Sequence, residues 1–401
     1  MKKVVATKKK ILFVINSLEC GGAEKSLVSL LPLLDPGRYD IDIMVFKKGG
    51  EFEIFLPGNC RILTPGGYLD RDLALGAMLR QGRLGDLWIR LSAALRLKLN
   101  TWRGSRRAHE AEILWPIVTS AVPRAVGRYD TAVAFGQGAP TYYVADKVDA
   151  PNKVAWINID TVKARYSKRF NTPYYDRYQT IVPVSDGLAV ILEREYRFEQ
   201  QRLRTIYDII NPDFIREMSR QGGGLPPGNG CRILTIGRLV EQKGYDIALA
   251  AAAILKGRGI DFHWYVIGEG ALRGELERGI AASELTECFT LLGVQVNPYG
   301  QLKECDIYAQ TSRFEGFCLT LAEARIFQKP LVSTNFTVVT NQIRHGENGL
   351  IAEMNGASVA DALERLIRDA GLRDRLIEAT GRDRIDNVET ELPKIEALLS
   401  A

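Results

Sequence analysis

Residues 311–330 have the sequence TSRFEGFCLTLAEARIFQKP, and this stretch decides the fold of the second half of the chain. The apolar run just before it, 306–310, predicts a buried strand. Gly316 allows a sharp turn or a close approach of the backbone to a ligand. From Phe317 onward the apolar residues recur at helical spacing. Strand, turn and helix in this order let backbone N–H groups at the helix N-terminus bind a phosphate.

Two carboxylates flank this turn. Glu315 lies in the loop before the predicted helix, and Glu323 lies within the helix. Carboxylates accept hydrogen bonds from vicinal hydroxyl groups, so a phosphate-binding turn between two of them suits a nucleotide-sugar. The alternative is an ordinary strand–turn–helix connection whose glutamates are both exposed to solvent.

Glu-Gly-Phe at 315–317, Glu323 and Lys-Pro at 329–330 together resemble the donor-site motif of retaining glycosyltransferases with the GT-B fold. The closest type is family 4 (glycosyl transferases group 1), in its bacterial surface-polysaccharide branch. The resemblance implies that Glu315 contacts the transferred sugar and that Glu323 binds the nucleotide ribose. The family usually has glycine where this chain has Cys318. The donor-binding residues implied around the turn are Glu315, Gly316, Phe317, Cys318, Leu319 and Glu323.

Further residues that match the family pattern precede the two glutamates. Gly237 and Arg238 follow a predicted strand, and Lys243 lies in the Gln-Lys-Gly sequence at 242–244. In the family the Arg and the Lys hold the donor diphosphate, so the resemblance gives both residues a catalytic and donor-binding role. Negative charge grows on the diphosphate as the glycosidic bond breaks, and two nearby cations stabilise it. Without the two glutamates, Arg238 and Lys243 would be interpreted simply as two solvent-exposed loop residues.

The resemblance implies an α/β fold of the GT-B type, with two Rossmann-like, doubly wound parallel-sheet domains that face a cleft. The residues agree, because apolar runs of strand length alternate with helical segments in both halves of the chain. The first domain, expected over 1–220, begins with a strand at 11–15. The turn at Gly21 and Gly22 then resembles the family's first loop, which admits donor phosphates or acceptor. The last strand of this domain is expected at 205–210.

The stretch GGGLPPGNG at 222–230 predicts an interdomain linker over 221–230, because glycine and proline suit neither helix nor strand interiors. A donor-binding domain is expected over 231–380. The remaining residues, 381–401, are expected to form a helical segment, and whether it returns to the first domain stays open.

Composition sets limits on compartment and cofactors. The six cysteines have no Cys-x-x-Cys spacing, which indicates reduced thiols and a cytoplasmic protein. The three histidines have no metal-ligand spacing, so we expect neither a metal nor a cofactor. The basic N-terminus is followed by an apolar run at 11–18 that lacks a small-residue cleavage site, so a signal peptide is not expected. No run of about 18 apolar residues suggests a membrane span.

Asn158 departs from the family pattern. It stands in VAWINID, 154–160, where many relatives carry the histidine of a Trp-Ile-His sequence in the acceptor domain. Asparagine binds a hydroxyl group but takes no proton at neutral pH. In same-face retaining transfer the leaving phosphate oxygen itself receives the acceptor proton, so Asn158 is compatible with catalysis. Asp160 either substitutes for the histidine or caps a turn. His109 lies in a basic region without a pattern and is expected to be solvated.

The first 220 residues carry 34 Lys and Arg against 24 Asp and Glu, and the remainder carries 19 against 24. Within this basic half, Gly85 and Asp86 precede an apolar stripe at helical spacing that cations surround, over 80–107. One interpretation is a helix packed on its own domain with solvated cations. The other is an in-plane helix on the anionic inner face of the cell membrane. The stripe is Leu87, Trp88, Leu91 and Leu95, and the cations are Arg83, Arg90, Arg96, Lys98, Arg103, Arg106 and Arg107.

The function that these patterns favour is transfer of a hexose from a nucleotide-diphosphate sugar to a glycan or a polyprenyl-diphosphate-linked acceptor, with retention and without a metal. A GT-B nucleotide-sugar epimerase and a noncatalytic sugar-binding GT-B protein stay open as alternatives. The chain has no Gly-x-Gly-x-x-Gly after an early strand, which disfavours a nicotinamide-dependent oxidoreductase. No recognised module supports nucleic-acid binding. The donor sugar, the nucleotide base, the linkage and the oligomeric state are left undetermined by the sequence.

Overall fold

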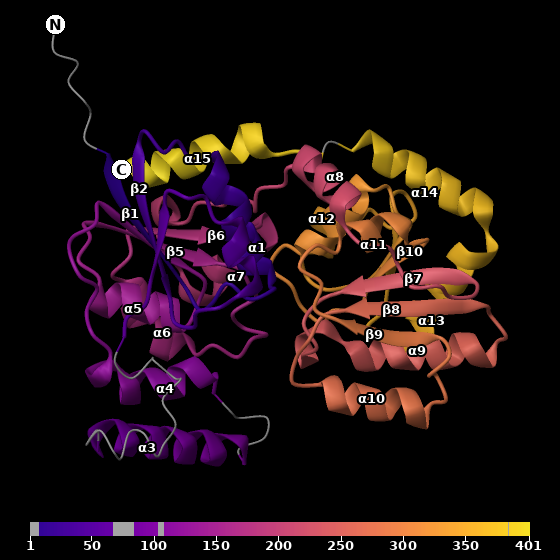
Figure 1. The fold of residues 1–401 in the computed structure, drawn as a ribbon, viewed down its shortest axis with the longest axis horizontal. Coiled ribbons are helices and arrows are strands. Elements are labelled where there is room, and N and C mark those ends of the chain that lie inside the picture. Colours follow the sequence, from indigo (N-terminus) through magenta and orange to yellow (C-terminus); the bar gives the residue numbers. More distant parts are fainter. Residues whose placement is uncertain (1–7, 67–83, 103–107, 384) are drawn as a thin grey trace, which may run out of the picture. The chain divides into compact units, whose positions relative to one another are not determined.

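A computed structural model describes residues 8–66, 84–102, 108–383 and 385–401 (Figure 1). The chain forms two compact units. The first consists of residues up to Glu19, Ala23–Tyr207 and Glu391–Ala401, and the second of Cys20–Gly22 and Asp208–Thr390. Each unit contains a six-stranded sheet whose strand pairs are all parallel. The α/β fold with two doubly wound sheets is therefore confirmed.

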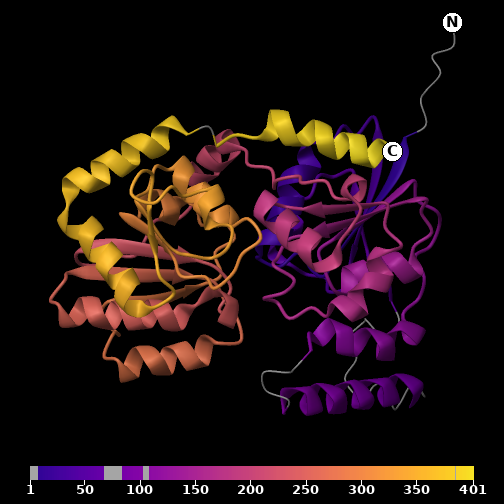
Figure 2. The same cartoon turned by 180° about the vertical axis from the view of Figure 1, so that it is seen from behind.

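The sheet of the first unit has the strand order β3-β2-β1-β4-β5-β6. Apart from the edge strand β3, its strands are buried almost throughout, as expected for parallel strands that helices cover on both faces. Helices lie on both sides of this sheet (Figure 2). The strands are β1 (Lys9–Ile15), β2 (Tyr39–Val45), β3 (Cys60–Leu63), β4 (Thr131–Phe135), β5 (Asn152–Ile157) and β6 (Thr180–Pro183). The α-helices are α1 (Gly22–Leu30), α3 (Leu84–Thr101), α4 (Glu110–Val118), α5 (Ala139–Lys147), α6 (Lys168–Tyr175) and α7 (Asp186–Tyr196).

The strand expected at 205–210 is wrong. Arg204 and Ile206 do donate backbone hydrogen bonds to Ile181 and Pro183 of β6, at 3.0 and 3.1 Å. However, Pro183 has no N–H to donate in return, so the ladder cannot continue in both directions. The segment is extended beside β6 without being a strand of the sheet.

The sheet of the second unit has the order β12-β11-β10-β7-β8-β9, which is the order of the first sheet when it is read from the other edge. Helices α9, α10 and α13 lie on one side of it, and α8, α11 and α12 lie on the other (Figure 1). The strands are β7 (Cys231–Ile236), β8 (Phe262–Ile267), β9 (Phe289–Gly293), β10 (Ile307–Gln310), β11 (Leu331–Thr334) and β12 (Leu350–Ala352). The α-helices are α8 (Pro212–Gln221), α9 (Tyr245–Gly257), α10 (Arg273–Ala282), α11 (Tyr299–Glu304), α12 (Leu319–Ile326), α13 (Gly356–Arg368) and α14 (Ala370–Arg382).

The segment 221–230, expected as a linker, lies within the second unit, which begins at Asp208. It packs against α11, because a Cβ atom added to Gly300 would lie 2.2 Å from the carbonyl oxygen of Gly223. Leu225 N–H donates to Glu304 at 2.9 Å, and Tyr265 donates to the carbonyl of Pro226 at 2.9 Å. Glycine and proline serve here for close backbone packing rather than for a free connection.

The C-terminal helix α15 (Val388–Ser400) packs on the first unit. Asn152 donates to the carbonyl of Leu398 at 2.8 Å, and Thr131 donates to that of Leu399 at 3.2 Å. These carbonyls belong to the last turn of the helix, where they have no partner within it. The described end of the chain is thus attached to the sheet that its beginning forms.

Candidate donor site

Both sheets have the strand order of the doubly wound dinucleotide-binding fold. In such sheets ligands bind beyond the carboxyl ends of the strands, where the order reverses. In the second unit this point lies between β7 and β10, which are paired in parallel. Gly237 and Arg238 follow β7, and the loop with Glu315 follows β10. The structure therefore brings the two predicted groups of residues to one edge of one sheet.

The loop after β10 is held firmly. Thr311 and Ser312 are fully buried. Arg313 donates its backbone N–H to the carbonyl of Gln242 at 2.8 Å, and its guanidinium forms an ion pair with Asp246 at 2.6 Å. Gly244 has a φ of +64°, and a Cβ atom there would lie 2.1 Å from the carbonyl oxygen of Thr311. These contacts fix the loop 311–315 against the loop 241–244.

Glu315 is buried, and polar side chains surround its carboxylate. Lys243 Nζ donates to Glu315 Oε1 at 2.6 Å, and their side chains are only 16% and 8% exposed. Ser312 donates to the same oxygen at 2.6 Å, and Gln310 does so at 3.4 Å. Gln242 donates to Oε2 at 3.4 Å. In this structure Lys243 and Glu315 thus neutralise each other.

Glu323 lies in α12 and is 2% exposed, so it is not a solvated surface glutamate. Tyr299, at the start of α11, donates its hydroxyl to Glu323 Oε1 at 3.1 Å. Burial and the adjacent Glu323 carboxylate raise the pKa of Tyr299 well above its usual value. Tyr299 was not found from the sequence, because it lies 24 residues before its partner and carries no motif of its own.

Cys318 occupies the N-cap of α12 with a φ of +72°, in the left-handed region that glycine adopts without strain. This conformation explains why glycine suits the position. Burial, and then the carboxylate of Glu315, raise the pKa of the Cys318 thiol to about 12, so it is protonated at neutral pH. Its neighbours Phe317 and Leu319 are also buried, and Gln342 donates to the carbonyl of Cys318 at 3.1 Å.

Arg238 is exposed at the same edge of the sheet, directly after Gly237, the residue that follows strand β7. The backbone around it is close-packed, since a Cβ atom at Gly268 would lie 2.0 Å from the carbonyl oxygen of Gly237. Arg238, Lys243 and the turn at 315–318 can thus present two cations and a helix N-terminus to one anionic group. That is the chemistry of a diphosphate site.

The remaining predicted site residues lie in the first unit or at its border. Gly21 and Gly22 stand between β1 and the body of α1, and a Cβ atom at Gly22 would meet nothing within 4 Å. Asn158 follows β5, and its backbone N–H donates to Gln137 at 3.2 Å. Both polar atoms of its side-chain amide are buried and make no hydrogen bond within the described part of the chain. Asp160 accepts the N–H groups of Val162 and Lys163 at 3.0 Å, as the cap of a turn does.

The expectation that His109 is solvated is wrong. Its ring stacks on Tyr166 with centroids 3.9 Å apart, and its Nδ1 accepts from the N–H of Ala111 at 3.2 Å as the N-cap of α4. Burial lowers the pKa of His109 to about 4, so the ring is neutral at physiological pH. The partner lies 57 positions further along the chain, which no local pattern could indicate.

The described ranges contain neither a metal-binding cluster nor a helix that could span a membrane. Among these residues, no group of three or more His, Cys, Asp or Glu side chains is placed to hold a metal ion. Within the same ranges, every helix is too short or too polar to cross a membrane.

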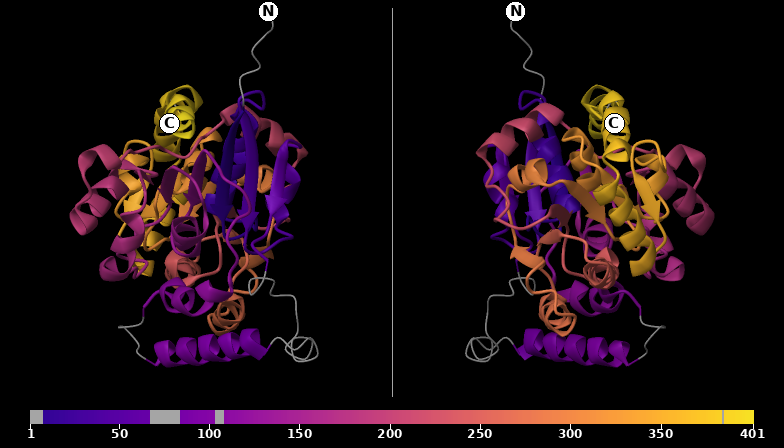
Figure 3. Two further views of the ribbon diagram at one scale, coloured as in Figure 1. Left: turned by 90° about the vertical axis from the view of Figure 1, so that its left-hand side faces the viewer. Right: turned by 90° about the vertical axis from the view of Figure 1, so that its right-hand side faces the viewer.

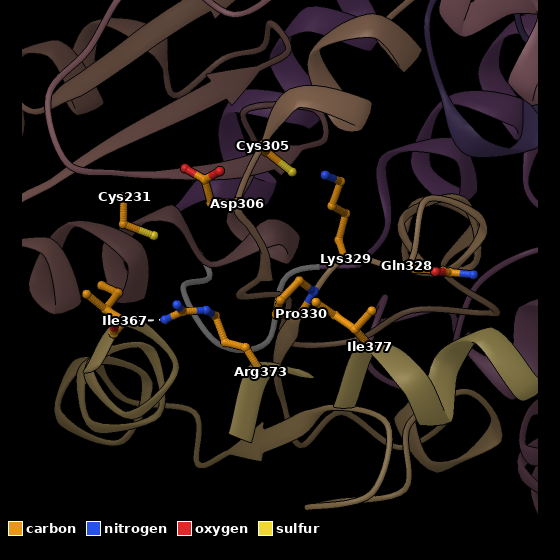
Figure 4. Close-up of a pocket in the computed structure, with 9 residues that line it drawn as sticks. All are labelled: Cys231, Cys305, Asp306, Gln328, Lys329, Pro330, Ile367, Arg373 and Ile377. Carbon is orange, nitrogen blue, oxygen red and sulfur yellow. Dashed lines mark hydrogen bonds between the residues drawn. The ribbon is translucent and has the colours of Figure 1, made fainter. Parts of the chain in front are cut away.

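A cavity of about 430 Å³ lies at the amino ends of β7, β10 and β11 (Figure 4). The Glu315 loop follows the carboxyl end of β10, so this cavity is at the other edge of the sheet. Burial lowers the pKa of Lys329 in its wall. The cavity is therefore not part of the candidate donor site. It is lined by Cys231, Cys305, Asp306, Gln328, Lys329, Pro330, Ile367, Arg373 and Ile377.

Residues 223–383 match the family described as glycosyl transferases group 1. Alpha-D-kanosaminyltransferase of Streptomyces kanamyceticus is 30% identical over 149 residues, which are 36% of this chain and 39% of that protein. An N-acetylgalactosaminyltransferase of Campylobacter jejuni, named for a diphospho-undecaprenol-linked sugar, is 28% identical over 50% of this chain and 53% of that protein. The amylovoran biosynthesis glycosyltransferase AmsK of Erwinia amylovora is 32% identical over 33% and 34%. The chain thus matches between about a third and a half of the length of these relatives.

Solved structures match almost the whole chain. Anabaena Alr3699/HepE in complex with UDP-glucose has a TM-score of 0.68 at 18% identity, over 98% of this chain and all of that one. TarM of S. aureus in complex with UDP and other ligands has a TM-score of 0.66 at 14% identity, over 98% and 100%. WaaG, involved in lipopolysaccharide biosynthesis, has a TM-score of 0.63 at 13% identity, over 98% and 100%. At these identities the likeness shows the fold.

Proposed function

We propose that this chain, whose second unit is a group 1 glycosyltransferase domain in a GT-B fold, transfers a hexose from a nucleotide-diphosphate sugar with retention of configuration. The observation that carries the proposal is the pair Glu315 and Glu323, buried on either side of the α12 N-terminus with Lys243 against Glu315. Buried carboxylates with hydroxyl, amide and ammonium partners are more typical of a site for a polar ligand than of a purely structural strand–turn–helix connection.

In this proposal the cationic donor-site residues bind phosphate, and the carboxylates bind hydroxyl groups. Arg238 and Lys243 bind the diphosphate, and they stabilise the negative charge that grows on it as the bond to the sugar breaks. Glu323 accepts hydrogen bonds from the ribose hydroxyls. Glu315 accepts those of the transferred sugar. In same-face attack the acceptor hydroxyl forms the new glycosidic bond, and its proton goes to the leaving phosphate oxygen.

The Lys243–Glu315 ion pair belongs to the state without ligand in this proposal. When the diphosphate binds, the Lys243 ammonium leaves the Glu315 carboxylate and pairs with a phosphate oxygen instead. Glu315 then loses its cation and gains sugar hydroxyls as donors. Each of the two buried charges thus keeps hydrogen-bonding partners throughout, which avoids the large cost of leaving one without any.

The acceptor we propose is a growing surface glycan or a polyprenyl-diphosphate-linked oligosaccharide, met at the inner face of the cell membrane by a cytoplasmic enzyme. The support is the Campylobacter jejuni relative, whose name includes a diphospho-undecaprenol carrier, together with the amylovoran biosynthesis enzyme. The neighbours solved with UDP or UDP-glucose make UDP-sugars the first donors to test.

The test is turnover of a panel of UDP-, GDP-, dTDP- and ADP-sugars with a polyprenyl-diphosphate oligosaccharide, in buffer with and without EDTA. We expect one donor class to be consumed, an undiminished rate in EDTA, and a product whose anomeric configuration by NMR equals that of the donor. An inverted product would refute retention. Interconversion of the nucleotide-sugar without transfer would favour the epimerase. Donor binding without either reaction would favour the noncatalytic protein, which Asn158 in place of histidine keeps under consideration.

A further inference from the structure

Helix α3, 18 residues long, exposes a continuous apolar stripe. Its large side chains recur every three or four residues, so they share one face of the helix. They are between 51% and 81% exposed, which is unusual for tryptophan and leucine gathered on one face. The stripe consists of Trp88, Leu91, Leu95, Leu99 and, directly after the helix, Trp102.

The opposite face of α3 is fixed to the first unit. Ala93 and Asn100 are buried there, against α4. The Asn100 amide donates to the carbonyl of Ala108 and accepts its N–H, both at 2.9 Å. Helix α4 is held in turn by Glu112, which accepts from Ser167 N–H at 2.6 Å. Helix α3 is therefore packed on its unit, and its exposed stripe is the side that the described part of this unit does not cover.

Helices α3 and α4 lie beside the carboxyl ends of the strands of the first sheet, where Asn158 follows β5. Ala111 in α4 is close to the loop after β4, since a Cβ atom added to Gly138 would lie 3.1 Å from its Cβ. The same loop reaches Asn158 through the Gln137 side chain. Figure 3 shows α3 beyond α4, as the outermost helix of this part of the unit. The stripe thus faces outward on the side where strands β4 and β5 end.

The charges around the stripe have one sign. Arg96 and Lys98 are exposed on its two flanks, at about 100° and about 60° from its middle by helical geometry. The sequence contains no Asp or Glu from Leu87 to His109. Arg90, in contrast, is partly buried and does not flank the stripe. Tryptophan stands at each end, and its ring suits the interface between lipid headgroups and acyl chains.

We propose that α3 docks the protein on an anionic lipid bilayer, with the helix in the plane of the interface and its stripe between headgroups and acyl chains. The proposal deepens the proposed function, because it brings the edge with Asn158 to the surface where a lipid-linked acceptor lies. Docking itself requires no transfer reaction. Each exposed Lys or Arg near such a surface contributes about fivefold in affinity, and salt weakens that part.

The test is co-flotation of the full chain with vesicles of phosphatidylcholine alone or with about 30 mol% phosphatidylglycerol. We expect binding to the anionic vesicles only, weakened by added salt. Arg96→Glu/Lys98→Glu should weaken it by at least about 25-fold, since two cations are lost and two anions gained. Trp88→Ser/Leu95→Ser should abolish it. Arg365→Glu/Arg375→Glu changes the same charge on exposed residues of α13 and α14, and it should leave binding unchanged.

Equal binding to both vesicles, or no effect of Arg96→Glu/Lys98→Glu, would overturn the proposal. A dimer in light scattering would also overturn it, if Trp88→Ser/Leu95→Ser converted this dimer to a monomer without changing vesicle binding. A second copy of the chain would then cover the stripe. Circular dichroism and thermal melts establish that the variants fold. Transfer to a water-soluble acceptor distinguishes the docking proposal from the transferase proposal. The stripe variants should retain this transfer activity although they no longer bind vesicles. Vesicle binding without any transfer would leave docking intact and refute the transferase.

Discussion

Single residues at the donor site differ in what they do without a ligand. Glu323 accepts from Tyr299, a neutral donor, whereas Glu315 is neutralised by Lys243. Removal of either glutamate therefore leaves a different partner behind. Loss of Glu323 strands a buried hydroxyl, and loss of Glu315 releases a buried cation.

The two glutamates should separate in calorimetry with a free nucleoside diphosphate. Glu323→Ala should weaken binding by roughly 1–3 kcal/mol, because ribose hydroxyls lose their acceptor. Glu315→Ala should leave this affinity unchanged or tighten it, since Lys243 is then free for the diphosphate, while turnover with the nucleotide-sugar falls sharply. Equal weakening in both variants would contradict the division of roles.

Arg238 and Asn158 should also separate, in steady-state kinetics. Arg238→Ala should lower kcat by about 100-fold or more, because it removes stabilisation of the leaving diphosphate. Asn158→Ala should lower it only modestly. It should not destabilise the fold, since both polar atoms of its amide are buried without a hydrogen bond in the described structure. An inactive Asn158→Ala beside a nearly normal Arg238→Ala would refute this prediction, since Asn158 would then be essential and stabilisation of the leaving diphosphate by Arg238 would not.

Cys318 tests how strongly the left-handed turn restricts its side chain. Cys318→Gly should change the free energy of unfolding by less than about 1 kcal/mol, because relief of strain offsets the greater freedom of the unfolded chain. Cys318→Val should cost about 2 kcal/mol or more, since a β-branched residue at a φ of +72° is strained. Urea denaturation measures both. Cys305→Val is the control, because Cys305 is buried with an extended backbone, and a loss as large as that of Cys318→Val would rule out the conformational cause.

Among the elements, α4 is the one whose start depends on a titratable cap. His109 can accept the N–H of Ala111 at Nδ1 only as a neutral ring, and this ring stacks on Tyr166. Its folded pKa of about 4 is below its usual 6.5, so the folded state binds fewer protons between these values. The stabilisation is complete above pH 6.5, and it is lost as the pH falls toward 4.

We therefore expect the wild type to lose about 1–2 kcal/mol of unfolding free energy between pH 7 and pH 4 through His109, after allowance for its partial exposure. The variant His109→Asn keeps a cap that accepts from the helix but does not titrate. The difference between wild type and His109→Asn in urea denaturation at the two pH values isolates this contribution from that of the carboxyl groups. A constant difference would show that the ring titrates normally.

Helix α11 packs closely against the backbone of residues 222–224. Gly300→Ala should lower the free energy of unfolding by about 2–3 kcal/mol, because its Cβ would overlap the backbone of Gly223. It should also disturb the adjacent Tyr299 and hence nucleotide binding. Gly257→Ala, at the end of α9 with nothing within 4 Å, is the matched control and should be neutral or stabilising. A harmless Gly300→Ala would restore the view of 221–230 as a free linker.

At the scale of the whole molecule, the two units use one topology twice. Each sheet reverses its strand order beside its first strand, and each places glycine-containing turns just beyond that point. In the second unit these turns carry Arg238, Lys243 and Glu315. Beyond strands β1 and β4 of the first sheet they are the turns with Gly21 and Gly22, which belong to the second unit, and with Gly136 and Gly138. The repeated topology thus gives each sheet an edge of the kind at which doubly wound sheets bind ligands, and the edge of the second sheet carries these charged residues.

The sequence by itself determined the parallel sheets, the strand–turn–helix around Glu315 and the place of Glu323, because helical and strand periodicity are local. Only the tertiary structure decided which side chains meet. Lys243 and Glu315 are 72 residues apart, and His109 and Tyr166 are 57 apart. Likewise, the packing of 222–230 and the exposure of the α3 stripe depend on which faces the neighbouring elements cover. Hydrogen bonds and burial between distant segments follow from the whole fold, so no window of sequence contains them.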